Sequence, residues 1–235
     1  MYGVTGAEAE APAGPGVDTA HAVTVIRHAG LAAIVSRIAG GASAVDAALE
    51  DLDRLEALAR AHAAVLDQAL AQGPVLPFRM GTVFANADGV RAMLDERRAA
   101  FASALRSLRG RSEWGVKVYA RRRRAREPVA TPPASGTDYL TRRRIERETA
   151  ERARQDVLAL LDAIHAQLQE RAEDSALLTA HSPDLVLNAV YLVTDAAAVP
   201  FAALAEQLAS EARRQGLRLD LTGPWPAYHF TALEA

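Results

Sequence analysis

The sequence predicts an α+β fold with two domains, in which helices pack on one face of small sheets and the C-terminal domain is a variant of the ferredoxin-like fold. Three observations lead to this prediction. Short β-rich runs alternate with long stretches whose apolar residues recur at helical spacing. The length of 235 residues suits two domains of about 100 to 130 residues each. Half of the residues are hydrophobic, so each domain can bury a core.

The N-terminal domain is predicted to span residues 1–110 and to begin with a short strand at 2–4. Two β-rich runs follow at 22–26 and 31–38, and Gly30 between them indicates a hairpin. These runs predict three strands in the first 40 residues.

Two long helices are expected in the rest of this domain. The first covers 43–70, with Ser43 as a candidate N-cap and Gly73-Pro74 as its end, because its leucines form one apolar stripe. The second covers 90–108, where apolar residues recur at spacings of three, four and seven, and ends at Gly110.

Between these helices lies the most distinctive segment of the domain, residues 76–84, for which a strand over 75–85 is expected. Pro77 cannot donate a ladder hydrogen bond, and Gly81 has no side chain to pack. A strand that carries both must lie at a sheet edge or a bulge, where it can present its backbone to another chain.

The C-terminal domain is predicted to span residues 111–235. Val116 and Val118 mark a strand on which Lys117 points to the other face. An Arg/Pro-rich loop is expected at 121–136.

A long helix is expected at about 139–178, followed by an almost continuously apolar strand over 185–193. Pro200 is placed in the first turn of another helix that ends at Gln215, and an alternating strand follows over 217–221. The resulting β-α-β-α-β order is the reason for predicting a ferredoxin-like variant.

Composition excludes several classes of function. The chain has 27 Lys and Arg against 29 Asp and Glu, so net charge gives no reason to expect nucleic acid or an anionic membrane as a partner. It has no cysteine, which excludes disulfides and thiolate chemistry. It has no window of 18 uncharged apolar residues, so we expect a cytoplasmic protein without membrane insertion.

Charge is nevertheless uneven in the second half. Residues 111–154 hold 13 basic and 6 acidic side chains, whereas 155–235 hold 4 basic and 11 acidic ones. The run Arg121–Arg124 is the best argument for nucleic-acid binding, because clustered arginines contact phosphates. No aromatic residue interleaves with this run, so a solvated loop or a contact with a protein is favoured.

The sequence contains no catalytic or metal-binding pattern. None of the six histidines has the i, i+4 spacing of a helical zinc site. The nucleophile elbow G-x-S-x-G and the glycine-rich phosphate loops are absent from the sequence. We therefore expect no enzyme activity, no metal and no cofactor.

Aromatic residues concentrate at the C-terminal end, where Trp225, Tyr228 and Phe230 stand among prolines. Two roles are open for them. They can pack back onto the core, or they can form an exposed apolar anchor for a partner. Together with Phe78 and Arg79 they are the candidate partner-binding residues of the chain.

Several separated blocks, in this order, resemble the gas vesicle GvpL/GvpF family of accessory proteins. The blocks are residues 2–4, 76–84, 113–118, 139–140 with the arginines that follow, 187–193 and 223–230. Two positions depart from the family pattern. Ala227 stands where a second proline is usual, and His229 where a serine is common.

The resemblance implies a non-enzymatic, cytoplasmic accessory protein that is associated with gas vesicles. It implies two α+β domains, the second a modified ferredoxin-like fold. It also implies that the partners are the small hydrophobic shell protein and other accessory proteins. The alternative function is a ferredoxin-like RNA-binding or regulatory module that uses the arginine run.

Overall fold

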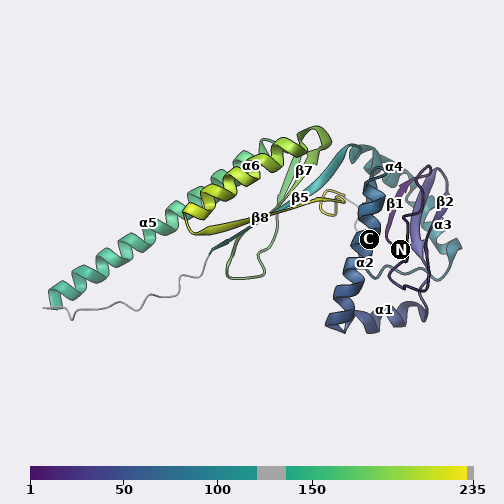
Figure 1. Ribbon diagram of the computed structural model, residues 1–235, viewed down its shortest axis with the longest axis horizontal. Helices are drawn as coiled ribbons and strands as arrows, with labels where there is room; N and C mark the ends of the chain where they lie inside the picture. Colours follow the sequence, from purple (N-terminus) through teal and green to yellow (C-terminus); the bar gives the residue numbers. More distant parts are fainter. Residues whose placement is uncertain (121–135, 232–235) are drawn as a thin grey trace. The chain divides into compact units, whose positions relative to one another are not determined.

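The structure, a computed structural model, describes residues 1–120 and 136–231, and the chain forms two compact units (Figure 1). The first unit holds residues 1–114, 192–195 and the described part of 223–235. The second holds the described part of 115–191 and residues 196–222. Mixed helix and sheet in both units confirms the predicted α+β class. The boundary at Gly110 between independently folding domains stays a prediction.

The first unit is built on a four-stranded antiparallel sheet of order β2-β3-β1-β4. Its strands are β1 Gly3–Gly6, β2 Val23–His28, β3 Leu31–Ser36 and β4 Val75–Pro77. The predicted hairpin is confirmed, and Ala29 and Gly30 both have positive φ, 52° and 82°, as two-residue hairpin turns require. At the start of β1, a Cβ on Gly3 would lie 2.6 Å from the Leu76 carbonyl oxygen, so only glycine permits this approach of β4.

The helix predicted over 43–70 is two helices, α1 Gly41–Leu49 and α2 Leu52–Leu70. The Asp51 carboxylate accepts the backbone N–H groups of Asp53 and Arg54, which starts α2 with a strong N-cap. Ser43 lies inside α1, whose N-cap is Gly40, so the Ser43 cap was wrong.

The helix predicted over 90–108 is also two helices, α3 Ala87–Glu96 and α4 Arg98–Ser107. Arg97 separates them with a non-helical backbone, φ −103° and ψ 12°. The apolar spacing runs through this break, since Leu94 before it and Phe101 after it are both buried, and for that reason the break is invisible in the pattern.

Helices cover both faces of the first sheet, so the structure adds a second helical layer to the one expected. One core is formed with α2, and its buried members are Tyr2, Val23, Ile34, Val65, Leu66, Ala69 and Val75. The other, which we call the larger core, involves α3 and α4. Its buried members are Val4, Leu31, Ala33, Leu76, Val90, Leu94, Phe101, Leu105, Leu108, Leu192 and Ala227.

The second unit is ferredoxin-like, with a sheet of order β6-β7-β5-β8. Its elements follow as β5 Arg111–Ala120, α5 Gly136–Gln169, β6 Asp174–Leu177, β7 Leu185–Thr194, α6 Asp195–Arg214 and β8 Leu217–Trp225. The expected β-α-β-α-β order becomes β-α-β-β-α-β, because β6 was included in the helix predicted to about 178. Two further expectations shift as well: α5 ends at Gln169, and Pro200 lies inside α6 and not in its first turn.

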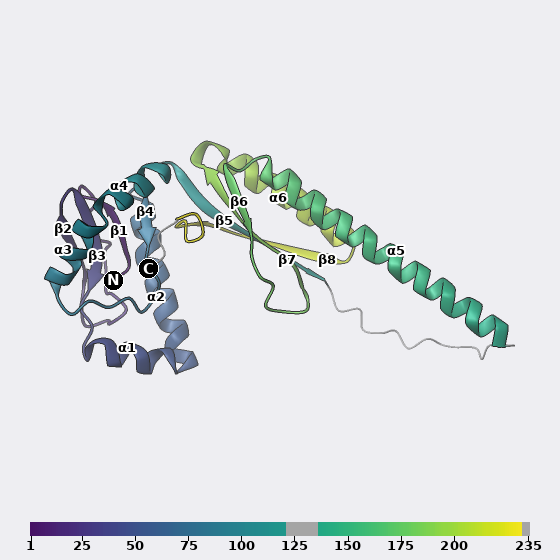
Figure 2. The ribbon, with the colours of Figure 1, turned by 180° about the vertical axis from the view of Figure 1, so that it is seen from behind.

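Helices α5 and α6 lie on the same side of this sheet in both views (Figure 1, Figure 2). Tyr191 of β7 joins them, because its hydroxyl lies 2.8 Å from Nδ1 of His165 and its ring lies 5.4 Å from that of Phe201. Burial raises the pKa of Tyr191 above its ordinary value. We call the opposite side, which carries Lys117, Tyr119 and Arg218 on β5 and β8, the open face.

The loop predicted at 121–136 lies outside the described residues up to position 135, and Gly136 already begins α5. Within the described ranges, no helix combines the length and the apolar composition that crossing a membrane requires.

Candidate functional site

The distinctive segment 76–84 is a strand only at its beginning. β4 ends at Pro77, so the prediction of a strand over 75–85 was wrong. After it, the Phe78 N–H donates to the Tyr2 carbonyl oxygen at 2.7 Å. Gly81 then takes a φ of 91°, which a strand residue does not adopt. The alternation of side chains between two faces therefore does not hold beyond Pro77.

Hydrogen bonds hold this irregular segment in place. The Thr82 hydroxyl donates to the Arg79 carbonyl oxygen at 2.7 Å, and the Met1 amino group donates to the Thr82 carbonyl oxygen at 2.8 Å. Nε2 of His62 on α2 donates to the Phe78 carbonyl oxygen at 3.1 Å. Burial lowers the pKa of His62, and it lowers the pKa of the Met1 amine to about 6. The contacts with His62 were not predictable, since a single histidine in a helix carries no pattern.

The segment forms one wall of a cavity of about 930 Å³, which we call the sheet-end groove. Residues 80–87 and Val90 line this wall, and residues 35–39 line the end of the sheet. Val45 of α1 and Leu58 of α2 line the opposite side. The groove thus lies within the first unit, where the helical layers extend past the sheet.

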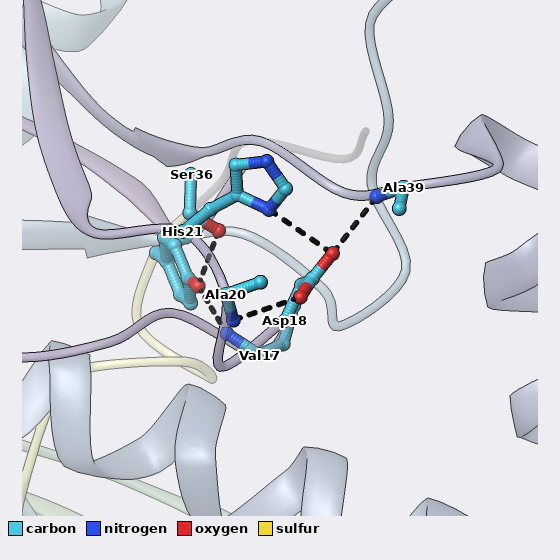
Figure 3. A network of polar contacts seen from close by, with 7 residues as sticks. Val17, Asp18, Ala20, His21, Ser36 and Ala39 are labelled. Atoms are coloured by element: carbon cyan, nitrogen blue, oxygen red, sulfur yellow. Dashed lines mark hydrogen bonds and ion pairs between the residues drawn. The ribbon is translucent and has the colours of Figure 1, made fainter.

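A polar network closes one side of the groove (Figure 3). The Asp18 carboxylate accepts the backbone N–H groups of Ala20 and Ala39, at 3.0 and 2.9 Å, and lies 3.2 Å from Nδ1 of His21. The bond from Ala39, followed by that from Ala20, lowers the pKa of Asp18, so this carboxyl group stays ionised. Nearby, the Tyr2 hydroxyl accepts the Val17 N–H and lies 2.8 Å from the Ser36 Oγ. The network ties the 17–21 loop to the segment between β3 and α1.

Charge is one-sided along the groove. Among the described residues that line it, Arg37 has the one permanently charged side chain, and none is Asp or Glu. His21 and His62 are the other basic side chains of the lining. An apolar groove with a cationic lining is suited to binding, and nothing in the sequence singles out Arg37.

The C-terminal residues 223–231, which we call the aromatic tail, combine both roles left open by the sequence. Pro226 and Ala227 are buried, and Phe230 packs against the larger core. Trp225 and Tyr228 are 38% and 41% exposed, respectively. The tail is therefore anchored in the first unit and still presents two aromatic side chains to solvent.

The anchor of the tail is Glu113, which the sequence gave no reason to select. This buried carboxylate accepts the His229 backbone N–H at 2.9 Å, and its second oxygen lies 2.7 Å from Nδ1 of the same residue. His229 replaces the serine common in the family, so it supplies a bidentate contact to Glu113. Burial, with the charges of Asp67 and Glu113, raises the pKa of Tyr228 to about 12.

The five predicted partner-binding residues thus lie in one unit but differ in exposure. Phe78 and Phe230 both pack against the larger core. Arg79, Trp225 and Tyr228 are exposed. Arg79, Trp225 and Tyr228 are therefore the most accessible of the five, and Phe78 and Phe230 are half-buried.

Two arrangements among the described residues would indicate a chemical role: a metal-binding group, and a nucleophile paired with a histidine and a carboxylate. No group of three or more His, Asp or Glu side chains among them is placed to hold a metal ion. Three histidines, His21, His28 and His229, pair with carboxylates, but in the described part of the chain no hydroxyl bonds to their second ring nitrogen. Nucleophilic catalysis needs that third group.

Known proteins share both the sequence and the fold. The profile of the family "Gas vesicle synthesis protein GvpL/GvpF" matches residues 1–232. Gas vesicle protein L of a Streptomyces species is 37% identical over 227 residues, which cover 89% of this chain and 83% of that protein. Gas vesicle protein F of the same organism is 30% identical over 203 residues, covering 80% and 83%.

The crystal structure of the gas vesicle protein GvpF from Anabaena matches with a TM-score of 0.71 at 17% identity, over 100% of this chain and 95% of that one. This match confirms the fold over the whole chain, including the ferredoxin-like second unit. The profile match and the relatives agree with the blocks identified in the sequence. The chain therefore belongs to the GvpL/GvpF family of gas vesicle synthesis proteins.

Proposed function

We propose that this protein is a non-enzymatic, cytoplasmic accessory protein of gas vesicle formation that binds the small hydrophobic shell protein through its first unit. Family membership supports an accessory role in gas vesicle formation. The observation that carries the finer proposal is that the segment 76–84, the most distinctive of the chain, forms a wall of the sheet-end groove.

The physical need for such a protein follows from the chemistry of an apolar subunit. Exposed apolar surface and open strand edges aggregate unless they are covered before assembly. The sheet-end groove offers an apolar lining, with Val83 38% exposed at its wall and Arg79 exposed beside it. A subunit held there is kept from others of its kind until it joins the growing shell.

The alternative, an RNA-binding module, has less support. RNA-binding sheets of ferredoxin-like domains stack bases on two or three aromatic residues of their open face. On the described strands β5 and β8, the open face carries the aromatic ring of Tyr119, and the Arg218 guanidinium already lies over it at 4.6 Å. The arginine run at 121–124 lies outside the described residues.

A pull-down against the purified shell subunit tests the proposal. Val83→Asp places a charge at the groove wall, and we expect at least about a tenfold loss of binding, because a partner would have to desolvate the charge. Arg79→Ala should weaken binding a few fold. The matched control is Leu52→Asp, since Leu52 is 81% exposed and does not line the groove.

Circular dichroism must show that each variant is folded. Unchanged binding by Val83→Asp and Arg79→Ala, together with loss of binding when Arg121–Arg124 become alanine, would move the contact away from the first unit. Loss of binding in Leu52→Asp as well would show that the effect is not specific to the groove.

A further inference from the structure

We propose that the sheet-end groove accepts an apolar peptide segment that carries a carboxylate, and that Arg37 pairs with this carboxylate. The inference rests on the proposed function and names the chemistry of the partner segment. It stands on the size, the lining and the charge of the groove, and on its position at a sheet edge.

The groove has the dimensions and the lining of a binding site. Its volume of about 930 Å³ lies near the upper end of the range of ligand clefts, about 300 to 1,000 Å³. Ile26 of β2, Ile38 of the segment between β3 and α1, Leu58 of α2 and Phe84 of the opposite wall contribute apolar side chains. An occupant must therefore be largely apolar to gain from entering.

The charged side chain of the lining, Arg37, favours an occupant with a negative charge. Arg37 is exposed and makes no hydrogen bond or ion pair with the described residues. Asp18, beside the groove, keeps its negative charge but forms no ion pair with Arg37: its carboxylate accepts the N–H groups of Ala20 and Ala39 and lies 3.2 Å from Nδ1 of His21 (Figure 3). Because no lining residue is acidic, a carboxylate in the groove meets a free guanidinium and no opposing side chain of the lining.

A peptide fits this site better than a fatty acid. Thr24 and Ile26 of the lining belong to β2, the edge strand of its sheet, so the groove is lined by strand side chains as well as by the irregular wall. Thr24, Thr82 and Asn86 add polar side chains at separate points of the lining. A peptide has polar backbone groups along its length to pair with these, whereas a fatty acid has one polar end.

The test uses two synthetic peptides and calorimetric titration. Each is N-acetylated and C-amidated and has six alternating leucines and alanines, followed by glutamate in one peptide and glutamine in the other. We expect the wild-type protein to bind the glutamate peptide at least about fivefold more tightly at low salt, as a partly exposed ion pair allows. Arg37→Gln should abolish this preference. The matched control Arg109→Gln, an exposed arginine of the same unit outside the groove, should keep it.

A second variant tests occupation of the groove itself. Thr24→Trp fills the groove from an exposed strand position, where tryptophan is tolerated, and should remove binding of both peptides. Val186→Trp on β7, also exposed, is its control. Equal affinity for the two peptides, a preference that survives in Arg37→Gln, or no binding of either peptide overturns the inference. Tighter binding of palmitate, lost in Thr24→Trp, would make the groove a lipid site and also overturns it.

The two proposals fail separately. Suppose that the intact shell subunit binds the wild-type protein and that Val83→Asp abolishes this binding. If Arg37→Gln then leaves the affinity for both peptides unchanged, only the carboxylate inference is wrong. If the peptides behave as expected and the shell subunit does not bind, the groove is confirmed as a peptide site and the proposed partner is wrong.

Discussion

The two sheets of this protein have the same number of strands but are covered differently. Helices pack against both faces of the first sheet, α2 on one and α3 with α4 on the other. In the second unit α5 and α6 lie on one side of the sheet (Figure 1). Its open face carries Lys117, Tyr119 and Arg218 on β5 and β8, and Val186 of β7 is 36% exposed. The difference lies in the helical cover: the first unit has helices on both faces and an apolar groove beside them, whereas the second has helices on one side.

The strand patterns explain this difference. Leu31 to Ile34 of β3 are all buried, as expected of a strand that is covered on both faces. In β5, Val116 and Val118 are buried and Lys117 between them is exposed, which is the pattern of a strand covered on one face. Burial does not alternate along β7, whose residues 189–193 are all buried, so alternation marks one-sided cover in β5 but not in every strand of that sheet.

The largest effect should come from truncating the core aromatic residue of each unit. Phe101 and Phe201 are both fully buried, and Phe101→Ala or Phe201→Ala should each cost about 3 to 5 kcal/mol. If residues 1–110 and 111–235 fold independently, each variant destabilises only its own unit. Urea unfolding followed by hydrogen exchange of each unit measures this.

Val199→Ala is the control for this pair, since Val199 is 80% exposed and its loss should change stability by less than about 0.5 kcal/mol. A single transition in which either core variant destabilises both units equally would contradict the domain prediction. The two units would then unfold together as one cooperative body.

A smaller effect is expected at the anchor of the aromatic tail. Glu113→Gln replaces one acceptor oxygen with an NH₂ group that faces a donor of His229, and should cost about 1 to 3 kcal/mol. Amide exchange of residues 227–231 should rise. Glu206→Gln, at an exposed position of α6, is the control. Unchanged exchange in Glu113→Gln would show that the tail is held by Ala227 and Phe230 alone.

The pH dependence of stability should distinguish the first unit from the second. Burial lowers the pKa of His62, so the folded state holds this side chain neutral. Below the unfolded pKa of about 6.5, the unfolded chain binds more protons than the folded one, and stability falls as the pH falls. The stabilising contribution of neutral His62 is therefore fully present above that range and is lost on acidification.

His62→Gln removes the titrating group and keeps a donor for the Phe78 carbonyl oxygen. Urea unfolding at pH 8, 7, 6 and 5 should show a shallower loss of stability for this variant than for the wild type below about pH 6.5. The Met1 amine still titrates in the His62→Gln variant. Because burial lowers the pKa of this amine from 8.0 to about 6, the stability of the variant should still fall as the pH drops below about 8. A variant with the same decline as the wild type would exclude His62 as the cause.

The smallest effect is expected on the solvated part of α5. Arg144 and Glu148 are exposed and form an i, i+4 pair at 2.8 Å. Arg144→Ala should lower stability by about 0.3 to 0.5 kcal/mol, and less at high salt. Circular dichroism in low and high salt measures the change. A loss above 1 kcal/mol would show that this part of α5 packs against something.

Much of the fold could be predicted from local patterns. The hairpin around Gly30, the strand at Val116 and Val118, the strand over 185–193 and the ferredoxin-like class follow from periodicity and turn chemistry, which act within a few residues. The blocks that resemble the GvpL/GvpF family were also sufficient to identify it. Each run and each block consists of residues that are close together in the sequence, and their order along the chain supplies the class and the family.

Element ends were less predictable, because a cap or a neighbouring strand decides them. Asp51 divides one leucine stripe into two helices, and Arg97 interrupts another without changing its spacing. β6 was merged into the preceding helix because only pairing with β7 makes this short segment a strand. Pro77 and Gly81 signalled an irregular strand, and the structure ends that strand at Pro77.

The candidate site was decided almost entirely by tertiary structure. The sequence by itself selected the segment 76–84 and the aromatic tail, since prolines and aromatic residues are recognisable alone. The groove brings Arg37, Leu58 and Val83 together from separate elements, and Glu113 meets His229 across 116 positions of the chain. Such contacts form only when tertiary packing brings distant parts of the chain together, and residue type and local spacing do not indicate which distant parts will meet.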